Sequence, residues 1–248
     1  MFQNIGEIAL LFGRTLKALP KTGRQFRKVL EQLFEIGNAS LLMACVLSLF
    51  IGGVLALQTG PVMSERGLQS FIGQIVGLSM CRELAPVMMA VLIAGRIGSA
   101  MAAEIGSMKV YQELDALQTM NIDPIPYLVL PRMLAIGIGL PILVIFSILV
   151  GWIGGAVVSV LNHEIAISLD GYMKSLGNGI DVMDILNGLI KSFAFALAIG
   201  TVSCHQGLAT IGGPRGIGRS VTKAVVNSIV LILLLDYVLT RVLMHLDK

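Results

Sequence analysis

The sequence predicts an all-α integral membrane protein with about five transmembrane helices, and two observations support this fold class. First, 55% of the 248 residues are hydrophobic and 13% are charged, whereas charged residues make up about 25% of an ordinary soluble domain. Second, several apolar runs reach the length of about 20 residues that a helix needs to cross a bilayer. These runs lack the alternating pattern of a β-barrel. The net charge of +3 is too small to indicate nucleic-acid binding.

Residues 1–36 are expected to form an N-terminal amphipathic region that does not cross the membrane. Apolar residues recur there at helical spacing, while Arg14 and Lys17 fall on other faces. A basic amphipathic helix of this kind lies in the headgroup plane, although the same periodicity also suits a helix packed on protein. The apolar positions are Ile5, Ile8, Phe12, Leu16, Leu19, Phe26, Leu30 and Leu33.

Residues 37–248 are expected to form the transmembrane domain. The third apolar run is uncharged and contains Pro141, so the helix there is long enough to tilt or to bend at the proline. The five candidate spans are roughly residues 39–60, 71–95, 133–161, 187–209 and 223–245.

The distribution of Lys and Arg gives the orientation. These residues gather before the first span and in the second and fourth connections, whereas the first connection holds only Arg66 and the third only Lys174. The positive-inside rule therefore places the N-terminus in the cytoplasm and, with five spans, the C-terminus outside. The residues counted are Arg14, Lys17, Lys21, Arg24, Arg27 and Lys28, then Arg96, Lys109 and Arg132, then Arg215, Arg219 and Lys223.

The second connection is expected to contain a short amphipathic helix over residues 107–120, ending before Pro124. Such a helix on the cytoplasmic side can dock on a soluble partner or lie on the membrane surface. Its apolar stripe is Val110, Leu114 and Leu117, and its charged residues are Lys109, Glu113 and Asp115.

Small residues recur every four positions in three segments, which lets helix backbones approach closely within a chain or between chains. The pattern itself does not separate these two uses. The ladders are Ser48, Gly52, Ala56 and Gly60; Ala94, Gly98, Ala102 and Gly106, with Gly95, Ser99, Ala103 and Ser107 as a parallel row; and Ser147, Gly151, Gly155 and Ser159.

Arg82 and Glu83 stand inside the second apolar run. The twelve uncharged residues between Glu83 and Arg96 make about 18 Å of helix, too short to cross the hydrocarbon, so both charges lie at membrane depth. Adjacent residues on a helix point about 100° apart, so each side chain needs a cavity or a partner on another helix. Asp236, another acid within an apolar run, is a candidate partner for Arg82. The pair is either a functional site or a buried structural pair that fixes helix register.

Two motifs are set aside. Gly213–Ser220 nearly matches a phosphate-binding loop, but Arg219 stands where lysine is needed and no buried strand precedes it, so a flexible basic loop is expected. Ser203 and His205 are two residues apart on a helix and do not face one another, which disfavours a Ser/His hydrolase. Neither motif provides a catalytic residue, and we expect no metal site.

The central block of the chain resembles the permease subunits of the MlaE/YrbE family. The resemblance covers roughly residues 30–245 and is most specific over LSMCRELAPVMMAVLIAGRIGSAMAAEIGSMKVYQELDALQTMNIDP and the LPR at 130–132. GGPRGIGRSVTKAVVNS and LLLDYVLT also match. Members of this family are permeases of ATP-driven lipid transporters that work with MCE-domain proteins.

The resemblance implies a permease homodimer in the bacterial inner membrane, two cytoplasmic ATPase subunits that bind ATP and Mg, and an MCE protein on the periplasmic side. Arg82 and Glu83 would then lie at a phospholipid cavity together with Leu57 and Gln58. Residues 107–120 would be the coupling helix that docks on the ATPase. The docking residues of that helix would be Glu113, Leu114, Asp115 and Leu117.

One alternative of another class is an ion-coupled secondary transporter that uses Arg82, Glu83 and Asp236 as a relay. Such transporters usually carry inverted repeats, and five spans without visible internal repetition argue against that architecture. An intramembrane hydrolase is the third possibility.

Overall fold

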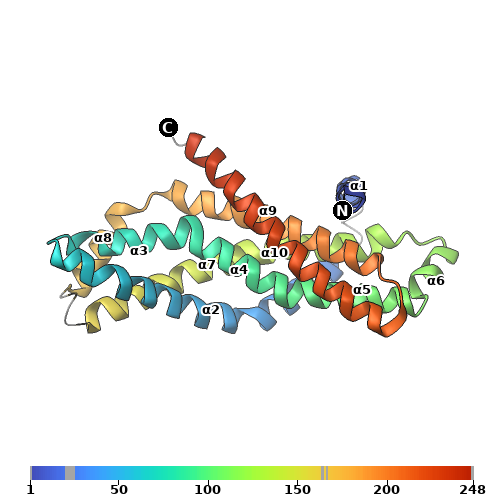
Figure 1. Ribbon diagram of the computed structural model, residues 1–248, viewed down its shortest axis with the longest axis horizontal. Coiled ribbons are helices and arrows are strands. Elements are labelled where there is room, and N and C mark those ends of the chain that lie inside the picture. Colours follow the sequence, from blue (N-terminus) through green and yellow to red (C-terminus); the bar gives the residue numbers. More distant parts are fainter. Residues whose placement is uncertain (1, 20–25, 163–164, 166, 247–248) are drawn as a thin grey trace. The chain divides into compact units, whose positions relative to one another are not determined.

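The computed structural model describes residues 2–19, 26–162, 165 and 167–246, and nearly all of these residues are helical, with no β-strand among them (Figure 1). Within these described residues, five helical stretches are long and apolar enough to cross a membrane, which confirms the predicted fold class. These stretches are Phe26–Glu65, Gln69–Val110, Ile125–Leu161, Val182–Leu208 and Gly213–His245.

The N-terminal region forms helix α1 (Phe2–Ala18), and the next helix, α2, runs from Phe26 to Glu65. The sequence analysis placed residues 26–36 in the interfacial region. They form the first turns of α2, because no proline interrupts the helix before Pro61, so the amphipathic start continues into the apolar span. Lys21 and Arg24 lie outside the described residues.

The second span is a chain of short helical segments. It contains two π-helical turns, η3 and η4, in which the backbone is wider than in an α-helix. The segments are η2 (Gln69–Phe71), α3 (Ile72–Ser79), η3 (Met80–Leu84), α4 (Ala85–Ile93), η4 (Ala94–Gly98) and α5 (Ser99–Val110).

The expected amphipathic helix over 107–120 is divided in two. Its first residues end α5, Gln112 takes a left-handed conformation with φ 62°, and a new helix, α6, spans Glu113–Thr119. The π-helical turn η5 (Ile125–Val129) follows and leads into α7 (Leu130–Leu161), which continues through Pro141.

The third connection contains a helix that was not predicted, α8 (Leu169–Gly179). The Ser168 hydroxyl caps it by accepting a hydrogen bond from the Gly171 amide at 3.1 Å. Helix α8 packs on α3 where Gly73 lies against the Tyr172 carbonyl (Figure 1). The Tyr172 hydroxyl is buried, and this burial raises its pKa above the ordinary value.

The fourth span, α9 (Val182–Leu208), starts earlier than expected, and α10 (Gly213–Leu246) forms the fifth. The basic segment 213–220, expected to be a flexible loop, is the start of α10. The turn before it uses positive φ angles at Gly212 (93°) and Gly213 (67°), which glycine adopts readily. Pro214 then stands in the first helical turn, where its missing amide proton costs nothing.

The chain divides into two compact units, and the boundaries fall inside four of the long helices. Residues 1–39 belong to unit 1 together with later segments; the functional division into residues 1–36 and 37–248 stays a prediction. Unit 1 is residues 1–39, 90–140 and 193–248, and unit 2 is residues 40–89 and 141–192.

Several positions of the small-residue ladders pack within one unit, whereas a Cβ added to Gly95 would meet nothing within 4 Å. In unit 2 the Ser48 and Ser147 hydroxyls lie 2.6 Å apart, and Gly52 faces the carbonyl of Gly151, so α2 and α7 touch through backbone. In unit 1 a Cβ added to Gly106 would lie 2.9 Å from the Thr210 hydroxyl. These positions therefore follow the intrachain interpretation.

Candidate functional site

The candidate site begins at the π-helical turn Met80–Leu84 of unit 2, whose widened backbone follows from Pro86. Proline has no amide proton, so the Arg82 carbonyl, four residues earlier, loses its usual helical donor. Ala85 likewise donates to Met80, five residues back, rather than to Cys81. The turn thus presents the carbonyls of Cys81 and Arg82 to the neighbouring helix.

Helix α9 supplies the missing donor. The Lys191 ammonium donates to the Arg82 carbonyl at 3.0 Å and to the Glu83 carboxylate at 2.8 Å. The Lys191 side chain is 3% exposed, so its charge depends on these two acceptors rather than on water. The proline and the acid therefore create a binding position for one buried ammonium.

Arg82 has a second partner on the same helix. Its Nε donates to Oδ1 of Asp184 at 2.6 Å, and the other oxygen of Asp184 accepts from the Asp181 amide at 3.0 Å. Asp184 lies in the first turn of α9, where the positive end of the helix dipole stabilises a carboxylate. The Asp181 amide and the helix N-terminus thus stabilise the Asp184 carboxylate independently of its ion pair with Arg82.

Gly188 allows α9 to come this close. A Cβ added to Gly188 would meet the Cys81 carbonyl and would lie 3.3 Å from the Pro86 ring. Residues 184, 188 and 191 are spaced by four and three, so they share one face of the helix. The face of α9 that meets the π-helical turn therefore consists of an acid, a gap and a base.

The four charges differ in exposure. Asp184 and Lys191 are buried, with side chains 5% and 3% exposed, whereas the side chains of Arg82 and Glu83 are 39% and 41% exposed. We call these four residues the charge cluster. Each open member is paired with a buried member of opposite charge, so one cationic and one anionic group remain partly exposed within the candidate spans Gln69–Val110 and Val182–Leu208.

A hollow of about 610 Å³ lies along the same helix, one turn before the cluster. It is open and mostly apolar, and Leu78 and Ser79, which line it, precede Arg82 by four and three residues. Apolar chains bound there would therefore lie close to the open charges. The lining residues are Met63, Leu68, Phe71, Gln74, Ile75, Leu78 and Ser79.

The other predicted cavity residues stand apart from these contacts. Leu57 and Gln58 are exposed on α2 of unit 2, whereas Arg82 and Glu83 bind α9. Asp236 is half-buried on α10 in unit 1, so its expected pairing with Arg82 is not tested, and the carboxylate that Arg82 binds is Asp184. Among the described residues, no group of three His, Cys, Asp or Glu side chains is placed to hold a metal ion.

The predicted docking helix uses its apolar stripe inside the chain. Leu114 is 3% exposed and packs in a cluster with Leu11 of α1 and Met133 of α7, and Leu117 packs against the same cluster. Glu113 and Asp115 are exposed. Leu114 therefore attaches α6 to its own chain, and the docking of this helix on an ATPase stays a prediction.

Sequence reasoning missed both buried members of the charge cluster. Asp184 was counted in a connection, and Lys191 was included in an apolar span without comment. Lys191 is the only Lys, Arg, Asp or Glu between residues 187 and 209, and Asp184 stands two helical turns before it. A single charge in an apolar span, with an acid two helical turns before it on the same face, could have indicated the two buried residues.

Comparison with known proteins gives a consistent result. Residues 29–242 match the family model described as Permease MlaE. A probable ABC transporter permease protein of Synechocystis is 40% identical over 243 residues, covering 94% of this chain and 92% of that protein. The intermembrane phospholipid transport system permease protein MlaE of Haemophilus influenzae is 34% identical over 243 residues, covering 98% and 92%. The chloroplastic protein TRIGALACTOSYLDIACYLGLYCEROL 1 of Arabidopsis thaliana is 35% identical over 233 residues, covering 94% and 66%.

Proposed function

This chain belongs to the MlaE permease family, and from that premise we propose that it moves phospholipid between the inner membrane and an MCE-domain partner. As an ABC transporter permease it is not the subunit that hydrolyses ATP; that activity belongs to a separate ATPase. The ion-coupled alternative does not fit such a family. The observation that supports phospholipid as the substrate is the half-exposed charge pair of a cluster whose four residues lie in two candidate membrane spans.

The cluster has the chemistry of a headgroup site. A guanidinium carries five N–H donors in a planar fork, and Asp184 occupies only the side that faces α9. The remaining N–H groups can donate charge-assisted hydrogen bonds to the oxygens of a phosphate. The half-exposed Glu83 can accept from a cationic headgroup while Lys191 holds it in place. Acyl chains would contact the hollow beside Leu78 and the exposed side chain of Leu57.

The assembly that we propose is a homodimer with its N-terminus in the cytoplasm, two ATPase subunits on the cytoplasmic side and an MCE protein on the periplasmic side. Arg82, Glu83, Leu57 and Gln58 would line the cavity between the two permeases. The exposed charges of α6, Glu113 and Asp115, would contact the ATPase. Leu114 and Leu117 would position that helix by packing on the apolar cluster of their own chain.

A reconstitution experiment tests the proposal. The permease is purified with its co-purifying ATPase, placed in proteoliposomes, and assayed for movement of a fluorescent phospholipid to an added MCE-domain protein. We expect transfer that requires ATP, persists when a protonophore collapses the ion gradient, and stops when the ATPase carries a substitution in its ATP site. Transfer that ignores ATP and stops with the protonophore would contradict the proposal.

A further inference from the structure

A second hollow, separate from the charge cluster, lies in unit 1 beside the N-terminal helix. Its volume is about 400 Å³, and it is bounded by α1, by the start of η5 and by the end of α9. Glu7, Arg14 and His205 give it polar groups, and Leu10, Ile125 and Leu208 give it an apolar floor. It therefore combines an acid and a base with hydrocarbon.

Two of the three charged residues of α1, Glu7 and Arg14, line the hollow. Glu7 and Arg14 are seven residues apart, so they share a face of α1 with about 10 Å of axial rise between them. The Glu7 side chain is 62% exposed and Oε2 lies 3.1 Å from Nε2 of His205, whose own side chain is 9% exposed. A carboxylate accepts about four hydrogen bonds, so Glu7 keeps free acceptor positions. Within the described part of the chain, Arg14 has no ion-pair partner.

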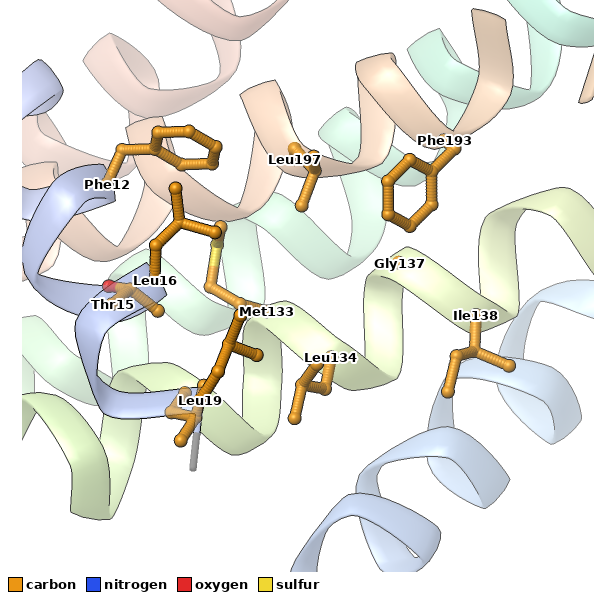
Figure 2. Close-up of a pocket in the computed structure, with 11 residues that line it drawn as sticks. Phe12, Thr15, Leu16, Leu19, Met133, Leu134, Gly137, Ile138, Phe193 and Leu197 are labelled. Atoms are coloured by element: carbon orange, nitrogen blue, oxygen red, sulfur yellow. The ribbon is translucent and has the colours of Figure 1, made fainter. Parts of the chain in front are cut away.

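The opposite flank of α1 is different. A ridge of Leu11, Thr15 and Ala18 is buried, and beyond it a second, smaller pocket is lined almost entirely by apolar side chains. Figure 2 shows the side chains that line this smaller pocket, which come from α1, α7 and α9. Glu7 and Arg14 thus lie on the flank of α1 that borders the larger hollow, and not on the apolar flank. The apolar flank is formed by Phe12, Leu16 and Leu19 with Met133, Leu134 and Leu197.

The position of the polar hollow indicates the kind of ligand. Ile125 stands at the start of one candidate membrane span, and Leu208 ends another, so we infer that the hollow lies near the level at which the spans leave the hydrocarbon. Phospholipid headgroups lie at this level, and basic amphipathic helices bind there. A zwitterionic headgroup offers a phosphate, an amine and an adjoining hydrocarbon chain, which match the three kinds of surface in the hollow.

We propose that this hollow binds the headgroup of an aminophospholipid from the surrounding membrane. Arg14 holds the phosphate, the Glu7 carboxylate accepts from the ammonium, and Leu10, Ile125 and Leu208 contact the first methylenes of the acyl chains. An ethanolamine headgroup binds better than choline, because only the former has N–H donors for Glu7. The site is independent of the transported lipid and does not rest on the proposed function.

The test uses the full chain in nanodiscs of phosphatidylethanolamine and phosphatidylglycerol that contain a trace of photoactivatable phosphatidylethanolamine. After illumination, peptide mass spectrometry locates the labelled residues. We expect labelling of α1 near Leu10 and of the segment around Ile125. Because a charge-assisted hydrogen bond is lost, Arg14→Gln should reduce this labelling by about tenfold. Arg14→Lys should retain most of it.

The matched control is Lys17→Gln, which removes a positive charge three residues later on the same helix but outside the hollow. Its labelling should equal that of the unaltered chain. Glu7→Gln keeps an oxygen that accepts from His205, so α1 remains attached while the ammonium contact is lost; phosphatidylethanolamine should then lose its advantage over a photoactivatable phosphatidylcholine. Equal loss in Lys17→Gln and Arg14→Gln, or no preference for ethanolamine in the unaltered chain, would overturn the proposal.

Discussion

The charge cluster of unit 2 and the Lys109–Asp115 pair of unit 1 are both ion pairs between helical segments, yet their surroundings differ. Lys191 is 3% exposed and has a carbonyl and a carboxylate as acceptors, whereas Lys109 is 37% exposed and binds a carboxylate that is itself 54% exposed. Water can replace the partner of Lys109 but not those of Lys191. The comparison teaches that position, rather than the number of ion pairs, decides which charges the fold depends on.

The largest effect is expected when one buried charge is removed from the cluster. Lys191→Met leaves Glu83 and the Arg82 carbonyl without their donor, which should cost about 3–5 kcal/mol and yield a protein that unfolds at a much lower temperature in detergent. The matched control is Lys174→Met, which removes an exposed lysine paired with Asp170 on α8. An unfolding temperature that falls by the same amount in both variants would contradict the distinction between the buried and the exposed ion pair.

Unit 1 provides the corresponding test for an apolar contact. Leu114→Ala should destabilise the attachment of α6 by about 2–4 kcal/mol, because it leaves a cavity between Leu11 and Met133. Hydrogen exchange should therefore increase in α6 while the membrane spans remain protected. Substitution of the exposed Glu113 by Ala should leave this exchange unchanged and weaken only the association with the ATPase. If Leu114→Ala leaves exchange in α6 unchanged, the packing described for α6 is wrong.

A smaller effect is expected at the glycine that brings α9 to the π-helical turn. Gly188→Ala places a methyl group against the Cys81 carbonyl, so the helices must separate, at a cost of about 1–3 kcal/mol. Gly177→Ala on α8 has open space around the added methyl and serves as the control. Lower thermal stability in Gly188→Ala alone is the expected result, and equal stability in both would contradict the close approach.

The smallest effect belongs to the exposed pair in unit 1. Lys109→Gln removes the ion pair with Asp115, which should change the stability by about 0–1 kcal/mol because water solvates both groups. The salt dependence of thermal unfolding measures the difference: added salt should weaken what the Lys109 pair contributes and barely affect the Lys191 pairs. The opposite order of salt sensitivity would contradict the comparison.

The sequence predicts the architecture well because each bilayer crossing needs a long apolar run, and such runs are visible one at a time. The need of Arg82 and Glu83 for partners on another helix was also predictable, since adjacent helical residues diverge in direction. The identities of those partners depend on which helices pack together, a property that no single run reveals. Asp236 was therefore a reasonable candidate for Arg82, but the structure pairs Arg82 with Asp184.

The surface that an amphipathic stripe contacts likewise could not be predicted from the sequence. Leu114 and Leu117 have the spacing of an apolar face whether that face meets a partner protein or the same chain. The left-handed residue Gln112 separates α6 from α5, and this break lets α6 fold back onto its own core. The early start of α2 had a simpler cause, because no helix breaker separates residues 26–36 from the span that follows.

The central claim is that the exposed N–H groups of Arg82 bind a phospholipid phosphate while the ion pair with the buried Asp184 holds the guanidinium in place. The measurement that tests it most directly is the number of phospholipid molecules bound per assembled complex in a charge-exchange variant, Arg82→Asp with Asp184→Arg, compared with its thermal stability. The exchange keeps an ion pair between the two helices but places the acid on the exposed side. The account predicts that Arg82→Asp alone loses both stability and bound lipid, and that the double variant recovers part of the lost stability, because the ion pair returns without the favourable helix dipole, while lipid occupancy stays low. Recovery of normal lipid occupancy and transport together with stability would show that the pair is purely structural.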